Sequence, residues 1–215
     1  MSGASLVELI AEADERGLAA SGLACLDRCV PLLGGDDEVL RPLWGNLAEG
    51  GAWDVALADA RVRLGGADIL EDPSADEAST LAYRMLGAVP SRRSAAELRE
   101  WADACSVAAL QIHRLLDTGP DGGTRASALS ARRAERTEGM SPLVAAELRR
   151  QVRILELLAH RGGGGDGVAG AGAVGLRQAL DISTEGRRVL RAVVSRRERG
   201  SKISKVGKAD TVSKV

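Results

Sequence analysis

The sequence predicts an all-α or mainly α protein, and three observations support this fold class. Apolar side chains recur at three- and four-residue spacing along most of the chain, which is the period of an amphipathic helix. Aromatic residues make up only 2% of the 215 residues and Phe is absent, so the core must be packed by Leu, Val and Ala, as in contacts between helices. Short β-prone runs occur only near the C-terminus. A chain of this length predicts one large or two small domains.

The first region, residues 1–117, is expected to fold as an acidic bundle of about five to six helices. Three capping boxes mark helix starts, because a serine and a glutamate three residues later satisfy each other's backbone N–H groups. Apolar spacing adds helices over residues 23–33, 36–47 and 53–64. Gly17 is expected to end the first helix. The three boxes are Ser5-x-x-Glu8, Ser74-x-x-Glu77 and Ser94-x-x-Glu97.

The third box opens the longest regular apolar stripe, which predicts a helix to about residue 117. Residues 118–140 are polar and rich in turn formers at their start, so we expect a linker or an exposed helix there. Ser141 and Pro142 then begin a helix to about residue 160, because serine caps helices and proline favours the first helical position. The stripe comprises Leu98, Trp101, Cys105, Ala108, Ala109, Ile112, Leu115 and Leu116.

Charge is divided unevenly along the chain, although the formal net charge is only −1. Residues 1–117 carry 10 Arg against 20 Asp and Glu, a balance of −10. Residues 118–215 carry 19 Lys and Arg against 10 acids, a balance of +9. All four lysines lie in the last 14 residues. Such a division indicates an acidic module followed by a basic one.

The basic module, residues 141–215, has an order of elements that points to a function. After the helix to about residue 160, a glycine-rich break covers residues 162–175. A short helix is expected over residues 176–180, and Ser183 is expected to cap a third helix that is rich in arginine. Valine and leucine side chains would turn one face of this third helix toward a core.

Two β-prone runs, residues 203–206 and 211–215, then flank a turn at Gly207 and Lys208. The whole order resembles a winged helix-turn-helix DNA-binding domain, in which the last helix enters the major groove and a β-hairpin wing touches the backbone. The resemblance implies a small winged-helix-like module with a short β-hairpin, in a transcriptional regulator that binds duplex DNA. In such a regulator we expect the acidic helical domain, residues 1–117, to sense a ligand or mediate self-association. It also implies that the following cations contact base edges or phosphates. They are Arg187, Arg188, Arg191, Arg196, Arg197, Lys202, Lys205 and Lys208.

Two other interpretations of this stretch stay open. Residues 186–215 carry ten cations against two acids, which suits a polyanion-binding surface but also a solvated basic helix with a disordered tail. The alternative function is a non-catalytic helical scaffold or adaptor whose basic tail docks on an acidic protein, or on the acidic module of its own chain. The apolar stripes in 94–117 and 142–160 suit a core or a dimer seam, so a homodimer also stays open.

No motif for catalysis, a cofactor or a metal stands out. Gly170-x-Gly172-x-x-Gly175 has the dinucleotide-binding spacing, but no strand precedes it and a flexible linker explains it better. Cys25 and Cys29 share a helix face without a second pair of ligands, so we expect them in the core rather than on zinc. We therefore expect neither a cofactor nor a metal, and the sequence favours a non-catalytic role.

A cytoplasmic location is expected from three features of the sequence. The N-terminal segment lacks the basic flank and long apolar run of a signal peptide. No stretch reaches the roughly 18 apolar residues that predict a membrane span. Three cysteines do not form a disulfide framework.

Overall fold

The protein is mainly helical in the part of the chain that the computed structural model describes, and no strand occurs in that part. The all-α prediction is therefore confirmed for these residues. The structure describes residues 4–65, 70, 72, 75–118, 125–133, 139–159 and 168–212, of which 118, 125, 127, 128, 133, 168–171 and 201–212 are described by their backbone alone.

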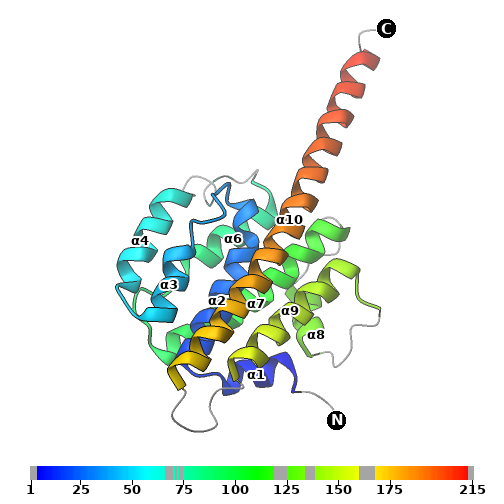
Figure 1. Ribbon diagram of the computed structural model, residues 1–215. Coiled ribbons are helices and arrows are strands. Elements are labelled where there is room, and N and C mark those ends of the chain that lie inside the picture. The colour runs from blue at the N-terminus through cyan, green and yellow to red at the C-terminus, as the bar shows by residue number, and fades with distance from the viewer. Residues whose placement is uncertain are drawn as a thin grey trace.

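Four helices form the centre of the fold. α2, α7, α9 and α10 pack against one another, with α1 across one end, α3 and α4 on one flank and α8 on the other (Figure 1). The elements are α1 (Leu6–Glu12), α2 (Glu15–Cys29), the 3-10 helix η1 (Val30–Leu32), α3 (Arg41–Glu49), α4 (Trp53–Leu64), α6 (Glu77–Gly87), α7 (Ala95–Thr118), α8 (Arg125–Arg133), α9 (Pro142–Ala159) and α10 (Val168–Val212).

Side-chain caps fix several helix starts, as the sequence predicts. The Glu8 N–H donates to Ser5 Oγ at 3.3 Å, and the Ser5 N–H donates to Glu8 Oε2 at 2.7 Å, which completes a capping box. At the start of α7 the Glu97 N–H donates to Ser94 Oγ at 3.4 Å. The predicted Ser74 box falls outside the described residues.

The prediction that Gly17 ends the first helix is wrong. Gly17 lies in the first turn of α2, where its N–H donates to Asp14 Oδ1 at 2.7 Å. The break between α1 and α2 falls at Ala13 because Asp14 caps a new helix. As a result α2 begins well before the expected start at residue 23.

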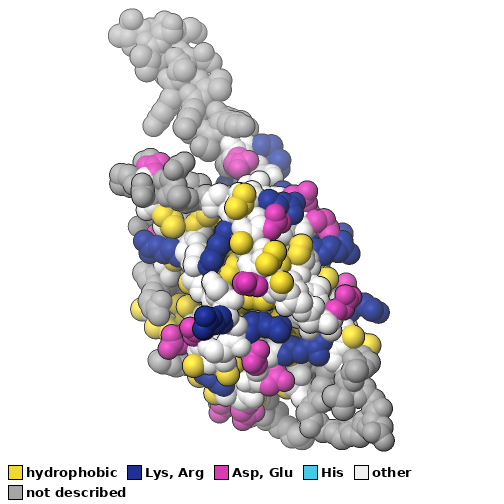
Figure 2. Space-filling view, turned by 90° about the vertical axis from the view of Figure 1, so that its left-hand side faces the viewer, with side chains coloured by type: hydrophobic (Ala, Val, Ile, Leu, Met, Phe, Trp, Pro, Cys, Tyr) yellow, Lys and Arg dark blue, Asp and Glu magenta, His cyan; other side chains and the backbone are white. Residues whose placement is uncertain are grey.

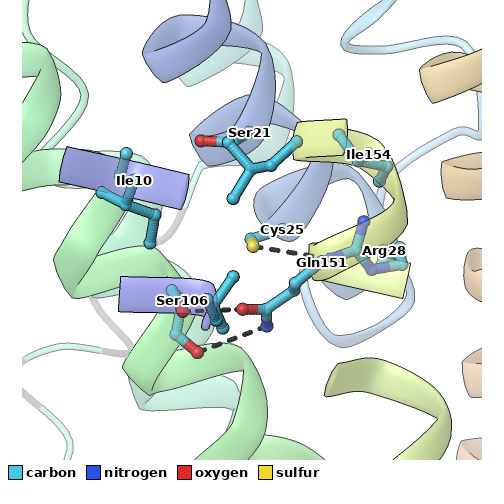
Figure 3. Close-up of a pocket in the computed structure, with 10 residues that line it drawn as sticks. Ile10, Ser21, Cys25, Arg28, Ser106, Gln151 and Ile154 are labelled. Atoms are coloured by element: carbon cyan, nitrogen blue, oxygen red, sulfur yellow. Dashed lines mark hydrogen bonds between the residues drawn. The ribbon is translucent and has the colours of Figure 1, made fainter. Parts of the chain in front are cut away.

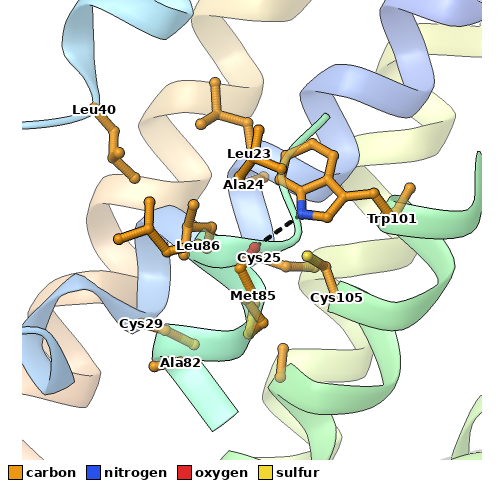
Figure 4. Close-up of a cluster of buried hydrophobic side chains, with 14 of the residues drawn as sticks. Leu23, Ala24, Cys25, Cys29, Leu40, Ala82, Met85, Leu86, Trp101 and Cys105 are labelled. Carbon is orange, nitrogen blue, oxygen red and sulfur yellow. Dashed lines mark hydrogen bonds between the residues drawn. The ribbon is translucent and has the colours of Figure 1, made fainter. Parts of the chain in front are cut away.

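α2 is the central helix of the core. Every residue from Gly17 to Cys29 is buried, so this helix is enclosed on all sides. Gly22 lies against the Trp101 ring of α7, where a Cβ would be only 2.6 Å from Cζ3. Trp101 donates its Nε1–H to Met85 O at 3.1 Å (Figure 4). One buried tryptophan therefore joins α2, α6 and α7.

Residues 168–212 form one continuous helix, which corrects the predicted order of elements. α10 covers residues 168–175 of the expected glycine-rich break and continues through Ser183 without interruption. The β-hairpin expected over 203–206 and 211–215 is not seen, because the backbone of residues 201–212 is helical. Residues 213–215 lie outside the described part. Figure 1 shows α10 crossing the body of the protein and projecting beyond it.

Tertiary packing explains why this helix forms. Each glycine costs a helix about 1 kcal/mol relative to alanine, but Leu176, Ala179 and Leu190 are buried where α10 packs on α2 and α9. Burial of an apolar face stabilises a helix more than local propensity does. Once formed, the helix extends beyond the core more easily than a new element can nucleate.

One hydrophobic core joins the acidic and the basic region. It includes Leu6 of α1, Leu148 of α9 and Leu190 of α10. α8, which lies in the predicted linker, packs on α7, and its Arg132 forms an ion pair with Asp103. The predicted division between the two regions therefore does not coincide with a gap in the core.

Candidate nucleic-acid interface

α10 has two parts with different surroundings. Over residues 176–194 one face of the helix is packed on the body, whereas the side chains of residues 196–200 are exposed. Residues 196–212 are termed the basic arm, because they carry six Lys and Arg against two acids. The predicted contact residues are divided between these two parts.

Arg187, a predicted DNA contact, is instead buried inside the protein. Its side chain is 5% exposed, and Nη1 lies 2.6 Å from Oδ1 of Asp27, whose side chain is 2% exposed. Burial raises the pKa of Asp27 to about 6, although Arg187 acts against this rise. The other oxygen of Asp27 has no hydrogen-bond partner among the described residues. Arg187 therefore fastens α10 to α2 and is not accessible to a phosphate.

Arg188 and Arg191 are neighbours of Arg187 on α10 but are more exposed than Arg187. Arg188 is exposed. Arg191 is about half exposed and pairs with Asp37, to which Arg187 Nε also lies close, at 3.4 Å. An exposed ion pair contributes little stability, so Arg191 can exchange Asp37 for another anion. Both arginines are accessible, but they belong to the body and not to the arm.

Arg196 and Arg197 mark the point where α10 leaves the body. Arg197 donates from Nη1 to Leu115 O at 3.0 Å, which satisfies a carbonyl near the C-terminal end of α7. Arg196 is exposed. The remaining predicted contacts occupy helical positions in the arm, and their side chains lie outside the described residues. They are Lys202, Lys205 and Lys208.

Cations recur at every third residue of the basic arm. Three residues turn an α-helix through about 300°, which is about 60° short of a full turn. Each cation position is therefore displaced by about 60° around the helix from the one before it. The whole series spans about 240° around the helix, and the arm is about 25 Å long. Positive charge is thus distributed around the arm and not confined to one face. The series is Arg196, Arg199, Lys202, Lys205 and Lys208.

The face of the body that carries α3 and α4 has no comparable surplus of one charge. Cationic and anionic side chains are interspersed on this face (Figure 2). Arg41 pairs with Glu38, and Arg63 with Asp59. Charge is balanced locally here, whereas the arm carries a net positive charge.

A buried polar cluster at the centre of the body was not predicted from the sequence. Arg28 donates from Nη2 to Glu147 Oε1 at 2.6 Å and from Nε to Oε2 at 2.8 Å, a bidentate pair. Gln151 donates to the same Oε1 at 2.8 Å and accepts from Ser106 Oγ at 2.6 Å (Figure 3). His113 Nε2 lies 3.5 Å from Glu147 Oε2, so the cluster comprises Arg28, Ser106, His113, Glu147 and Gln151.

The protonation states of this cluster are set by its own contacts. Burial raises the pKa of Glu147, but Arg28 and His113 outweigh this effect and hold the pKa at about 2. Burial lowers the pKa of His113, against the opposing effect of Glu147, so the ring is neutral at pH 7. Its Nδ1 lies 2.7 Å from Ala109 O, and a carbonyl only accepts, so Nδ1 carries the proton.

The buried polar cluster has no room for a substrate. The cavity beside Cys25, Arg28 and Gln151 measures about 10 Å³ (Figure 3), roughly the space of one water molecule. Arg28 also donates to Ser183 Oγ of α10 at 3.5 Å. The cluster therefore links α2, α7, α9 and α10, and its arrangement fits a structural role.

The sequence contains a feature that indicates the buried charges of α2. Asp27 and Arg28 interrupt an otherwise apolar run from Leu23 to Val30, and buried charges are rare unless they are paired. Their partners, Arg187 and Glu147, lie 160 and 119 residues away. No local spacing could identify these partners.

The cysteines lie in the core, as the sequence predicts. Cys25, Cys29 and Cys105 are buried and free, and burial raises the pKa of Cys25 to about 12. This thiol therefore stays protonated and unreactive. Within the described residues, no group of three or more His, Cys, Asp or Glu is placed to hold a metal ion.

Comparison with known protein families, with curated proteins and with solved structures finds no match to this chain. None of the described helices is long and apolar enough to cross a lipid bilayer. A function therefore has to be argued from the basic arm, its anchorage and the surface around it.

Proposed function

We propose that this protein is a non-catalytic DNA-binding regulator that contacts duplex DNA through the basic arm, which is anchored in the helical body. The observation that carries the proposal is the arm itself. It is part of a continuous helix that is packed in the core at one end and projects from the body at the other (Figure 1). Cations stand at every third position along it.

The distribution of these cations favours duplex DNA over a flat acidic surface. A flat surface meets one face of a helix, whereas the major groove, about 12 Å wide, encloses an inserted helix between two lines of phosphates. Cation positions that span about 240° around the helix are suited to both lines. Continuous basic helices enter the major groove in this way in other classes of DNA-binding protein.

The anchorage of α10 supports the same function. Leu190 and the Arg187–Asp27 pair hold the part of α10 before the arm in the body. The root of the arm, where Arg196 and Arg197 leave the body, is therefore ordered before any ligand binds. Such preorganisation reduces the entropy cost of association. In this proposal Arg187 acts as an anchor, Arg197 supports the root, and the direct contacts come from Arg196, Arg199 and the three lysines of the arm.

Binding of a labelled DNA duplex of about two helical turns, or about 20 base pairs, tests the proposal. The test variant is Lys202→Gln/Lys205→Gln/Lys208→Gln. The logarithm of the affinity falls with the logarithm of the salt concentration, and each lost phosphate contact makes this slope less steep by about 0.9. We therefore expect the slope to become shallower by about 2 to 3 and the affinity to decrease. Arg63→Gln/Arg84→Gln/Arg92→Gln removes the same charge from the body and serves as the control.

A truncation complements the triple variant. Removal of residues 200–215 leaves Arg187 and Leu190 in place, so the body keeps its core contacts. A cut at residue 184 would remove both residues and destabilise the body, which would confuse loss of binding with loss of folding. Duplex binding with unchanged affinity and salt dependence in the triple variant and in the 200–215 truncation would contradict the proposal.

A further inference from the structure

An open groove lies at the root of the basic arm, between α7, α9 and α10. Its volume is about 390 Å³. Val189 is 36% exposed in it, and Leu143 and Val193 are only partly buried. This groove is termed the root groove. Its apolar lining consists of Leu116, Pro142, Leu143, Ala146, Val189 and Val193.

The surroundings of the root groove are positively charged. Arg196 lines it and is exposed. Pro142 and Leu143 belong to the first turn of α9, so the positive end of that helix dipole faces the groove. At the end of α7, the hydrogen bond from Arg197 to Leu115 O offsets the negative end of the dipole. Asp117 contributes an opposite charge to the lining, but the cations and the arm outweigh it.

We propose that the root groove is the docking surface for an acidic amphipathic helix of a partner protein. Apolar side chains at positions i, i+3 or i+4 and i+7 of such a helix would pack against Leu143, Val189 and Val193. Carboxylates along the border of its apolar face would meet Arg196. A second copy of this chain, docked through the same groove, would bring two basic arms together, and the repulsion of like charges opposes that arrangement.

Occupation of the root groove has a consequence for the arm. Carboxylates on Arg196 would compete with DNA phosphates for the same cation, so the partner and the duplex are expected to weaken each other's binding reciprocally. The groove is built by α7, α9 and the packed part of α10, and only Arg196 and Arg197 of the arm line it. The docking proposal can therefore be tested without DNA and does not depend on duplex binding.

Fluorescence anisotropy of the full chain with designed peptides tests the proposal. The first peptide forms a helix of about five turns, or about 18 residues, with Leu at the anchor spacing and Glu elsewhere. The second peptide has Lys in place of every Glu. We expect saturable binding of the Glu peptide, at least tenfold weaker binding of the Lys peptide, and a loss of affinity with added salt.

Two variants locate the binding surface. The positive charge added by Val189→Lys would by itself strengthen binding of the Glu peptide. We nevertheless expect this variant to bind the Glu peptide about tenfold or more weakly, and that loss of affinity would report the missing apolar anchor. Val55→Lys, at a position that is 64% exposed on α4, is the matched control and should bind as the wild type does. Arg196→Glu, at an exposed position, should lower the affinity for the Glu peptide and raise the affinity for the Lys peptide. Circular dichroism would verify that all three variants fold.

Three results would overturn the proposal. One is the absence of saturable binding of the Glu peptide. Another is equal affinity of this peptide for the wild type, Val189→Lys and Arg196→Glu. The third is a wild-type dimer in light scattering that Val189→Lys dissociates, because a second copy of the chain would then occupy the groove.

Discussion

Gly186 of α10 lies directly on the side chain of Arg28 of α2. A Cβ at Gly186 would stand 3.0 Å from Arg28 Cγ and 3.2 Å from Arg150 Cδ, and it would overlap Arg28 Cδ. Arg28 cannot move aside, because two hydrogen bonds to Glu147 hold its guanidinium group. The glycine thus lets α10 approach the buried polar cluster closely.

Gly186→Ala is therefore expected to destabilise the protein. Alanine favours a helix over glycine by about 1 kcal/mol, but overpacking a rigid core costs about 1 to 3 kcal/mol, and here we expect the cost to prevail. Urea unfolding measures the difference. Gly45→Ala in α3 is the matched control, since its Cβ would meet no described atom within 4 Å, and it should stabilise by about 0.5 to 1 kcal/mol. A more stable Gly186→Ala variant would contradict the close contact.

Two adjacent arginines are expected to differ sharply in their effect on stability. Arg187→Gln leaves the buried Asp27 without its ion-pair partner, which should lower the free energy of unfolding at pH 7 by about 3 kcal/mol. Arg188→Gln, at an exposed position, should change it by less than about 0.5 kcal/mol. Because the pKa of Asp27 is about 6 beside Arg187 and higher without that arginine, the cost of Arg187→Gln should shrink as the pH falls from 7 through 6, where Asp27 takes up a proton in both proteins. Equal effects of the two substitutions would show that Arg187 is not anchored as described.

Glu147→Gln should remove a pH-dependent part of the stability. The pKa of Glu147 is about 2, below the ordinary value of 4.5, so its contribution is fully present above pH 4.5 and is lost as the pH falls through 2. The difference in unfolding free energy between wild type and Glu147→Gln should therefore shrink by roughly 3 kcal/mol from pH 5 to pH 2. Glu100→Gln, which removes an exposed carboxylate from α7, is the matched control. A difference that stays constant with pH would contradict the ionised pair.

Nitrogen NMR of the imidazole rings should find His113 neutral and protonated at Nδ1. Burial lowers the pKa of His113 from the ordinary 6.5, and the proton on Nδ1 is held by Ala109 O. Stability linked to this ring is therefore present above pH 6.5 and declines as the pH falls and the unfolded state takes up the proton. A titration midpoint above 6.5, or a proton on Nε2 in the neutral ring, would be incompatible with this environment.

Local features of the fold could be predicted from the sequence, whereas the course of the last helix could not. The capping boxes at Ser5 and Ser94 and the stripe containing Trp101 depend on neighbours within one or two turns, and the structure bears them out. The glycines before Leu176 and the β-branched residues after Arg199 locally favour breaks and strands. The packing of α10 on α2 and α9 outweighs the first preference, and propagation of the helix from this packed part outweighs the second.

The candidate interface shows the same limit. The basic character of residues 186–215 is evident from composition, but the role of each arginine depends on the distance to its acid. Arg187 and Arg188 are equivalent by residue type, yet a rotation of about 100° between adjacent helix positions turns one toward Asp27 and leaves the other exposed. An uncertainty of one residue in helix register is enough to exchange these roles.

The pairing of α2 with α10 also has a consequence for the growing chain on the ribosome. Asp27 and Arg28 are made early, but Arg187 follows Asp27 by 160 residues and Glu147 follows Arg28 by 119. At a translation rate of about 5 to 20 residues per second, the most buried helix of the protein waits about 8 to 32 seconds for Arg187. Throughout that interval α10 is not yet packed on the apolar side chains of α2. We therefore expect the nascent chain to bind chaperones until α10 emerges.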